Sequence, residues 1–501
     1  MFSRSWSRPF SESGGVGRPA FVTEFGLWTD EQTAAAEQIE ASLDEVDLVR
    51  LVFGDPHGLA RSKTLTVDAF RSVLRNGMDF SSGPFIFDTG HAAALDYLAD
   101  PGVGVDEIAG AGSFVLVPDP LTFQLLPHEG PRTAWVLGDE YLRDGSPHPL
   151  SARNVLRQVV ARYAARDLTP VLGLEVEWYL TKRLPGPPGN AGNGFGLQGA
   201  APEVEAVNSG YQFNLDSNYD SVAHFTSPLA LKLLELGLPL RSIEHESGPG
   251  QIETTFNPMH ALDTADAMLL FRTMVKQTAT RQGYHATFMS LPRVDSFDPS
   301  GWHLHQSVMD AKSGRNIFAA TEGGISDEGR AYIDGLLARA RDLCLLSVPT
   351  VNGYRRLSSE FSLSPTRIGW SYEDRSVMLR VVGGGSATHI ENRTGEPTAN
   401  PYLAIAAQLS AGFDGLTATP GAAPRPAGGE DAYETLPQSL DEALEAFRAG
   451  QGAELLGKPL AATLAKLKES EVSRFEAWRA QERPAEGQVT EWEQREYFEA
   501  Y

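Results

Sequence analysis

The chain has 501 residues, one cysteine and a formal net charge of −23 at pH 7, and its length exceeds what a single hydrophobic core usually organises, so two domains are expected. The acidic balance opposes phosphate backbones and anionic lipid surfaces, which argues against nucleic acid and membranes as partners. Cys344 stands alone in an apolar stretch, so an internal disulfide and a cysteine-rich metal site are excluded and a buried structural thiol is expected.

Residues 1–28 lack the apolar segment of a secretory signal. No uninterrupted apolar run approaches the roughly 18 residues that a bilayer span needs. We therefore expect a flexible N-terminal tail and a cytoplasmic protein. Arg4, Arg8 and Arg18 among serines leave a transit peptide as an alternative to a flexible bacterial extension.

A small α+β unit is predicted after the tail. Residues 29–43 have the pattern of an amphipathic helix, residues 46–53 that of a strand, and a Gly-Asp-Pro-His-Gly turn follows. Residues 115–119 and 133–137 add short strands. We place the end of this unit near residues 132–144.

The remainder has the alternation of short strands and helices that is typical of an α/β or α+β catalytic domain. The predicted helices span 152–166, 263–282, 327–346 and much of the chain from Leu440 onward. Two Gly- and Pro-rich stretches, 183–199 and 417–430, cannot form a core; we expect the first to be a mobile insertion. No internal repeat is present.

The first pair of candidate metal ligands lies in the predicted strand Val171–Leu180. Glu175 and Glu177 are two residues apart, so they point to the same face of that strand, between apolar neighbours. Two carboxylates that face a core need cations. A solvent-facing strand would produce the same spacing, so this pair alone does not establish a metal site.

Three further clusters repeat this arrangement. Glu246 and Glu253 flank a Gly-Pro-Gly turn that lets the backbone double back. His303 and His305 are two residues apart, and so are a carboxylate and a guanidinium further on, Glu391 and Arg393. A single histidine is usually structural, but the joint occurrence of four such clusters predicts a metal site.

Sites rich in carboxylates, with imidazole and no thiolate, suit Mg²⁺ or Mn²⁺. Such ions suggest phosphate chemistry. We expect four arginines to line the cavity of this metal site, because guanidinium groups match carboxylate and phosphoryl oxygens: Arg356, Arg375, Arg380 and Arg393. Each of them could instead be a surface salt-bridge partner.

These clusters, in this order, resemble the glutamine synthetase family, from about Leu48 through the segment Asn400-Pro-Tyr-Leu to the end of the chain. The resemblance implies an α+β fold with an N-terminal β-grasp domain and a catalytic domain whose curved antiparallel sheet forms part of a barrel between subunits. The implied domains are a tail at 1–28, the β-grasp domain at 29–138 and the catalytic domain at 139–501. It also implies a homo-oligomer, a dodecamer of two hexameric rings.

The resemblance assigns roles position by position. Glu177, Glu246 and Glu253 would hold the metal on the glutamate side. Glu175, His303 and Glu391 would hold the metal on the ATP side. The substrate-binding residues would be Arg356, Arg393, Gly301 and Glu360. The ATP-binding residues would be Ser307, His305, Arg375 and Arg380. Catalytic roles would fall to Arg375, Glu253 and Asp55, the last contributed to the amine pocket of a neighbouring subunit.

The implied reaction joins the γ-carboxylate of glutamate to an amine through γ-glutamyl phosphate, with ATP as co-substrate and two or more Mg²⁺ or Mn²⁺ ions per site. Cations and arginines are needed because the carboxylate and the triphosphate repel each other. A closing flap would keep the acyl phosphate from water.

Departures from the family pattern concern the amine. Family members that use ammonia carry a glutamate in the flap, whereas Ser362 or Leu363 stands nearest that place here and Glu360 is two or three residues out of register. We therefore expect a larger organic amine, such as a polyamine, ethanolamine, an alkylamine or an aniline. Glutamine synthetase using ammonia is the alternative.

Further departures from the family pattern change expected contacts to glutamate and phosphate and leave the metal ligands unchanged. Asp298 and Pro299 replace the usual residues before Ser300-Gly301, and His389 replaces an arginine of the phosphate region. Tyr433 lies near a position that some relatives adenylylate, although an ordinary loop tyrosine explains it as well. Two other interpretations stay open: a silent structural family member, and a two-metal hydrolase that works without ATP.

Overall fold

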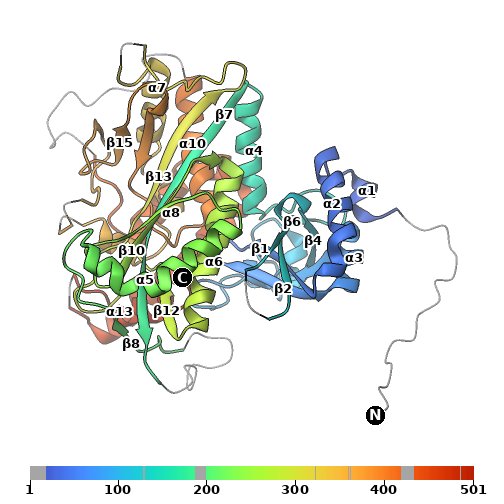
Figure 1. The fold of residues 1–501 in the computed structure, drawn as a ribbon, viewed down its shortest axis with the longest axis horizontal. Coiled ribbons are helices and arrows are strands. Elements are labelled where there is room, and N and C mark those ends of the chain that lie inside the picture. Colours follow the sequence, from blue (N-terminus) through green and yellow to red (C-terminus); the bar gives the residue numbers. More distant parts are fainter. Residues whose placement is uncertain are drawn as a thin grey trace.

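The computed structural model describes residues 19–127, 130–186, 199–321, 323–358, 360–361, 363–418, 434–485 and 487–501. Two lobes lie side by side in Figure 1. The smaller lobe contains the N-terminal residues, and the larger lobe is built around two long paired strands, β7 (Leu168–Arg183) and β13 (Trp302–Asp310). No helix in the described ranges is long and apolar enough to cross a membrane.

The small lobe contains a mixed sheet with helices beside it. The spatial order of its strands is β2 (Ala60–Thr66), β1 (Leu48–Gly54), β6 (Thr133–Tyr141), β4 (Ser113–Pro118) and β3 (Met78–Ser81), with β5 (Gln124–Leu125) also paired to β6. Its helices are α1 (Phe21–Phe25), α2 (Asp30–Ser42) and α3 (Val67–Asn76). Helix α2 begins in a capping box, in which Thr29 and Gln32 exchange side-chain to main-chain hydrogen bonds.

The large lobe contains a curled, mainly antiparallel sheet. The strands that complete it are β8 (Val204–Ala206), β9 (Leu240–His245), β10 (Gln251–Phe256), β11 (Met259–His260), β12 (Tyr284–Thr287), β14 (Trp370–Tyr372), β15 (Leu379–Val382) and β16 (His389–Asn392). The main path runs β14, β15, β16, β13, β7, β10 and β9. Strands far apart in the sequence therefore become neighbours.

Helices surround this sheet. They are α4 (Ala152–Ala164), α5 (Asp216–Glu235), α6 (Ala261–Arg281), α7 (Asp327–Ala338), α8 (Cys344–Ser347), α9 (Gly353–Arg356), α10 (Pro401–Thr417), α11 (Leu440–Ala449), α12 (Gly452–Leu456), α13 (Lys458–Glu482) and α14 (Glu491–Tyr497). Short 3₁₀ turns occur at Leu43–Glu45, Gly83–Phe85, Asp106–Ala111, Pro120–Thr122 and Gly385–Ala387. Helices α4 and α6 contact β7, and α10 packs against α4, α6 and α7.

The two faces of β7 differ in character. Leu174, Val176 and Trp178 are buried in the core, and Glu175 and Glu177 alternate with them and are only partly buried. The two-residue period predicted from the sequence is confirmed. The expectation that both carboxylates face the core is wrong, because the apolar residues that alternate with them occupy that face.

A buried arginine joins the lobes. Arg153 at the start of α4 forms ion pairs with Asp119 and Asp139 of the small lobe, at 2.9 and 2.8 Å, and with Asp266 of α6, at 2.7 Å. Breaking such a network would leave charges buried without partners, so it holds the lobes in one arrangement.

Several predicted features need comment. The helix predicted over 327–346 is wrong as a single element: the chain turns between α7 and α8, where Asp342 accepts from Arg339 Nε at 2.9 Å and from the Gln451 N–H at 2.9 Å. Cys344 is buried with a free thiol, as predicted. Strand β6 continues to Tyr141, past the boundary predicted at 138/139, and the domain limits stay a prediction.

Some predictions fall outside the described residues. These are the tail as far as residue 18, most of the 183–199 insertion, most of the 417–430 stretch, Ser362 and Tyr433.

Candidate active site

The sheet of the large lobe brings the four predicted clusters together. Glu253 on β10 lies opposite Glu177 on β7, and His303 on β13 lies opposite Glu175. Glu391 on β16 in turn pairs with His305. The antiparallel register therefore places side chains from four adjacent strands on one face of the sheet.

The centre of the cluster is Glu175. Its two carboxylate oxygens contact His303 Nδ1 at 2.6 Å and His305 Nε2 at 3.0 Å. His303 Nδ1 is also 3.5 Å from a carboxylate oxygen of Glu391. Possible ligand atoms lie within 4.8 Å of one another in two sets: Glu175 with His303 and Glu253, and Glu175 with His305 and Glu391.

Among the described residues, no imidazole or guanidinium forms a hydrogen bond or ion pair with Glu246 or Glu253 on the β9–β10 side. Burial, followed by the negative charge of Glu177, raises the pKa of Glu246 to about 8. Burial, followed by the charges of Glu175 and Glu177, raises the pKa of Glu253 to about 10. Neighbouring carboxylates at this density cannot all ionise without a cation.

The opposite side of the cluster is already compensated. Burial opposes ionisation of Glu175, but hydrogen bonds from His303 and His305 outweigh it and hold the pKa of Glu175 well below its usual range. Burial likewise opposes ionisation of Glu391, and the charges of His303 and Arg393 lower the pKa of that carboxyl.

This donor set fits hard divalent cations. Carboxylate oxygens and imidazole nitrogens within one small volume, with no thiolate, are ligands that suit Mg²⁺ or Mn²⁺. The causes of the raised pKa values of Glu246 and Glu253 are burial and neighbouring carboxylates, so a nearby cation would favour the ionised form of both side chains.

The cluster lies between two cavities, of about 610 and 510 Å³. Glu175, Glu244 and Glu253 line both of them. Two ligands could therefore approach the same carboxylates from two directions, with the cations between them.

The larger cavity contains buried guanidinium groups. Arg356 of α9 donates to the main-chain oxygen of Arg393 at 2.8 Å and to that of Thr394 at 3.2 Å, and burial lowers its pKa to about 10. Arg393 donates to Glu391 at 2.6 Å. Such fixed, buried guanidinium groups can receive the carboxylates of an amino acid.

Gly301 lies beside the Arg356 guanidinium. Its N–H donates to Glu177 at 2.8 Å, and a Cβ there would stand only 2.5 Å from the Arg356 guanidinium. Glu360 and the exposed Arg375 also line this cavity, together with Arg380, which forms an ion pair with Glu391.

The smaller cavity contains the residues predicted on the nucleotide side, Ser307 and His305. The hydroxyl of Ser307 lies 3.4 Å from the main-chain oxygen of Val171. His389, which replaces the arginine expected from the family pattern, also lines this cavity. Arg375 and Arg380, predicted for ATP, line the other cavity instead.

Asp55 is not brought to the cluster within one chain. It lies in the turn between β1 and β2, where its buried carboxylate accepts from the N–H groups of His57 and Leu59 at 2.9 Å and from Arg61 Nε at 2.7 Å. It lines neither cavity.

Sequence reasoning did not assign a role to Glu244 or Phe213. Glu244 lies opposite Glu253 across the β9–β10 pair and lines both cavities. The spacing of Glu244 and Glu246, the same as that of Glu175 and Glu177, was the available signal. Phe213 lies in a loop, and no periodic pattern marked it.

Comparisons with known proteins agree with this geometry. Residues 149–497 match the sequence profile of the glutamine synthetase catalytic domain. The chain is 39% identical over 497 residues to gamma-glutamylanilide synthase of Acinetobacter sp., covering 95% of this chain and 98% of that protein.

Two further relatives are named for different activities. The chain is 31% identical to glutamine synthetase of Thermococcus kodakarensis, covering 89% of this chain and 95% of the relative. It is 30% identical to gamma-glutamylethanolamide synthetase GlnA4 of Streptomyces coelicolor, covering 91% and 93%. Among solved structures, one described as apo GmaS without ligand superimposes with a TM-score of 0.71 at 28% identity, covering 91% of this chain and 98% of that one.

Proposed function

Because this chain belongs to the glutamine synthetase family, we propose that it catalyses the ATP-dependent ligation of the γ-carboxylate of glutamate to an amine. One observation carries most of the argument: a carboxylate and imidazole cluster lies between a cavity with buried arginines and a second cavity lined by Ser307 and His305. This arrangement can hold an amino acid and a nucleotide on opposite sides of bound cations.

The family resemblance divides the ligands between two cations, whereas both close sets of ligand atoms in the structure contain Glu175. Glu177, Glu246 and Glu253 would hold one Mg²⁺ or Mn²⁺ ion. Glu175, His303 and Glu391 would hold the second, and the contact of His305 with Glu175 adds a further donor there. The ions supply positive charge that offsets the repulsion between a carboxylate and a triphosphate.

On the glutamate side, Arg356 and Arg393 would bind the carboxylate of the amino acid, beside Gly301 and Glu360. On the nucleotide side, Ser307 and His305 would contact ATP. Arg375 and Arg380 would reach the transferring phosphoryl group from the larger cavity, because both residues line it next to the cluster.

The reaction then has two steps. The γ-carboxylate oxygen attacks the γ-phosphorus of ATP, the bond to the bridging oxygen breaks, and ADP leaves with γ-glutamyl phosphate formed. The amine attacks the acyl carbon, loses a proton, and inorganic phosphate leaves. Glu253, which lines both cavities, would hold one of the cations there, and that cation would supply positive charge beside the reacting carboxylate.

We infer that the amine is organic. Phe213 and Leu363 line the larger cavity with 65% and 59% of their surface exposed, so an apolar body could bury area there. The anilide and ethanolamide synthetases among the relatives support this inference. Ammonia is the second candidate, because the carboxylate of Glu360 lines the same cavity.

Membership of the family also supports finer proposals. We infer that the small lobe is a β-grasp domain and that the chain assembles as a dodecamer of two hexameric rings. In that assembly the turn that carries Asp55 would face the amine pocket of a neighbouring chain. The mass of the protein in solution, measured by light scattering, would test the assembly.

The decisive experiment measures ADP release and amide formation with glutamate, Mg²⁺, ATP and a panel of amines that includes ammonia, ethanolamine, an alkylamine, putrescine and aniline. We expect turnover that depends on all components and is fastest with an organic amine. Glu253→Ala should abolish it, and the exposed Glu205→Ala should not.

Each rival has its own signature in this assay. Absence of ADP release with every amine would indicate a silent family member. Hydrolysis without ATP would indicate a two-metal hydrolase. A wide advantage for ammonia in kcat/KM would leave glutamine synthetase as the function.

A further inference from the structure

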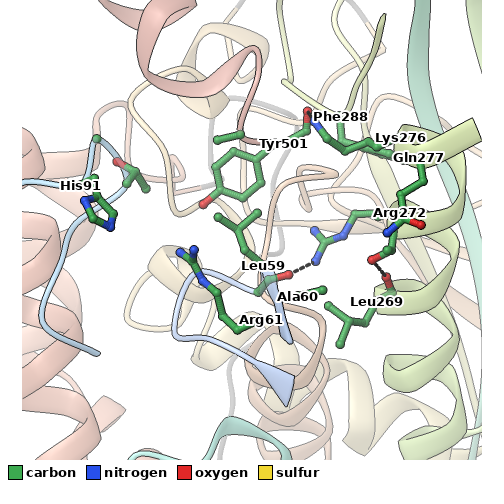
Figure 2. A pocket seen from close by; sticks show the side chains of 15 residues that line it. Leu59, Ala60, Arg61, His91, Leu269, Arg272, Lys276, Gln277, Phe288 and Tyr501 are labelled. Atoms are coloured by element: carbon green, nitrogen blue, oxygen red, sulfur yellow. Dashed lines mark hydrogen bonds between the residues drawn. The ribbon is translucent and has the colours of Figure 1, made fainter. Parts of the chain in front are cut away.

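A separate cavity lies where the small lobe meets α6. Its volume is about 490 Å³, and none of its lining residues lines the two cavities at the carboxylate cluster. Figure 2 shows Arg272 and Lys276 extending into it from α6, Arg61 from β2, and the ring of Tyr501 between them.

The lining of this cavity is cationic in an acidic protein. Arg61, His91, Arg272 and Lys276 line it, and no aspartate or glutamate is among its lining residues. The whole chain carries 65 Asp and Glu and 42 Lys and Arg side chains, so a wall with three Lys or Arg side chains and no Asp or Glu departs from the average. This contrast indicates a place for an anion.

Arg272 is a buried cation without an anionic partner among the described residues. Its guanidinium donates to the main-chain oxygens of Gly58, Pro397 and Ala399, at 2.7, 2.9 and 3.0 Å. Burial lowers its pKa to about 10. Carbonyl oxygens satisfy its hydrogen bonds, but they do not neutralise its charge.

Lys276 lies one helical turn further along α6. Its ammonium donates to the main-chain oxygen of Glu499 at 2.8 Å and to a carboxylate oxygen of the last residue, Tyr501, at 2.6 Å, so one of its three donors remains. Burial, with a smaller contribution from the charge of Arg272, lowers its pKa to about 7. A bound anion would offset this cost.

Arg61 presents donors from the opposite side. Its Nε is held by the buried carboxylate of Asp55, and no described residue accepts from its two terminal nitrogens. The side chain is 36% exposed, so those nitrogens are accessible. A guanidinium fixed at one end is well suited to a planar carboxylate.

The rest of the wall is apolar and held in place. Leu59, Leu269 and Phe288 contribute aliphatic and aromatic surface. Gly58 has a φ of +75°, and a Cβ there would approach Asn400 Cα to 2.7 Å. The turn therefore has little freedom to move, and the cavity is largely formed before any ligand arrives.

We propose that this cavity binds a small organic monocarboxylate with an apolar or aromatic body. The cations would receive the carboxylate, and the apolar wall would bury the body. Inorganic phosphate fits less well. Its oxygens would face the apolar part of the wall as well as the cations, and the hydrogen bonds to water lost there would not be replaced. The proposal does not depend on the ligase activity.

Binding there would tighten the junction of the two lobes. Arg272 already bridges Gly58 of the small lobe to Pro397 and Ala399, which follow the strand that carries Glu391. A carboxylate beside this guanidinium removes the cost of its uncompensated charge. We therefore expect the ligand to raise the thermal unfolding temperature of the full-length protein.

Isothermal titration calorimetry of the full-length protein with benzoate tests the proposal, with benzamide as a neutral control of the same shape and inorganic phosphate as a second anion. We expect saturable binding of one benzoate per chain, unchanged by saturating glutamate and Mg²⁺, and at least tenfold weaker binding of both controls. Loss of benzoate binding on addition of glutamate would place the ligand at the carboxylate cluster and overturn the proposal.

Two variants locate the site. Lys276→Met removes the charge and Thr273→Met fills the cavity without changing charge; each should weaken benzoate binding at least tenfold. Lys312→Met, at an exposed lysine elsewhere, should leave it unchanged. The site would be refuted if folded Thr273→Met bound benzoate as tightly as the wild type does. It would also be refuted if the wild type did not bind benzoate.

Discussion

Glu177 and Glu253 lie directly opposite each other on adjacent antiparallel strands, β7 and β10. Like charges in this position destabilise a sheet. The protein nevertheless places Glu244 opposite Glu253 on the other side, so three carboxylates form a row across β7, β10 and β9. A row of this kind is costly unless a cation is bound or a carboxylate takes up a proton, and the first prediction depends on it.

The first prediction concerns Glu253→Gln. A neutral amide needs no proton on folding, whereas Glu253, with its pKa raised to about 10, must take one up at pH 8. The metal-free variant should therefore unfold at a temperature about 2–5 °C above the wild type. Ligase activity should fall about 100-fold or more, because a cation ligand is lost.

Differential scanning calorimetry with and without MgCl₂ measures the first effect, and ADP release measures the second. Mg²⁺ should stabilise the wild type and have little effect on the variant. The exposed Glu205→Gln is the matched control. Equal stabilisation of both proteins by Mg²⁺ would contradict the assignment of Glu253 as a ligand.

The second prediction concerns pH and Glu140, which lies on β6 and accepts from Ser151, the N-cap of α4, at 2.6 Å. Burial raises the pKa of Glu140 to about 7, above its usual 4.5. The contribution of the protonated Glu140 to the free energy of unfolding is fully present below pH 4.5 and is lost as the pH rises through 7. Glu140→Gln should therefore be more stable than the wild type at pH 8, by about 1–3 kcal/mol, and close to it at pH 4.5.

Urea unfolding at both pH values checks this difference, with the exposed Glu445→Gln as control. A variant that is less stable than the wild type at pH 8 would show that the ionised carboxylate is needed by its neighbours.

The third prediction concerns Gly301→Ala. The added methyl group would meet the Arg356 guanidinium, which main-chain oxygens hold in a buried position, so the guanidinium should be displaced and the protein should lose some stability without unfolding. We expect the KM for glutamate to rise about tenfold, with a smaller change in kcat, because Arg356 would be displaced from the carboxylate it binds. Steady-state kinetics measures both constants.

Gly384→Ala serves as the control, because a Cβ there meets no other atom within 4 Å. An unchanged KM for glutamate in Gly301→Ala would remove Arg356 from the glutamate side of the site.

The fourth prediction concerns Leu363→Glu. A carboxylate on this part of the cavity wall would attract ammonium and repel an apolar body. The ratio of kcat/KM for ammonia to that for the best organic amine should rise about tenfold or more. Leu234→Glu, at an exposed leucine of α5, is the control, and an unchanged ratio would show that Leu363 does not contact the amine.

Much of the candidate site was predictable because strands place every second residue on one face. The pairs Glu175 with Glu177 and His303 with His305 were read from spacing alone, and their local geometry is as expected. Spacing does not reveal which strands are neighbours. The contact of His305 with Glu175, which joins it to the cluster, depends on the pairing of β13 with β7.

Sequence alone also failed where packing decides local structure. The periodic pattern over 327–346 continues through the turn between α7 and α8. Arg339 and Asp342 form an ion pair at this turn, but neither residue has an unusual helical propensity, so the sequence does not mark the break. Arg272 gave no signal either, because a single arginine in an amphipathic helix is normally solvated.

The sequence by itself determined the chemical types of the donors, their two-residue spacing on strands and the helical and strand periods, because these depend on covalent geometry and local sterics. Only the tertiary structure decided that β16 lies next to β13 and β10 next to β7, that the cluster separates two cavities, and that a third, cationic cavity forms at the junction of the lobes. The reason is that burial and cross-strand hydrogen bonding act between residues far apart along the chain, and no local pattern records which partners they select.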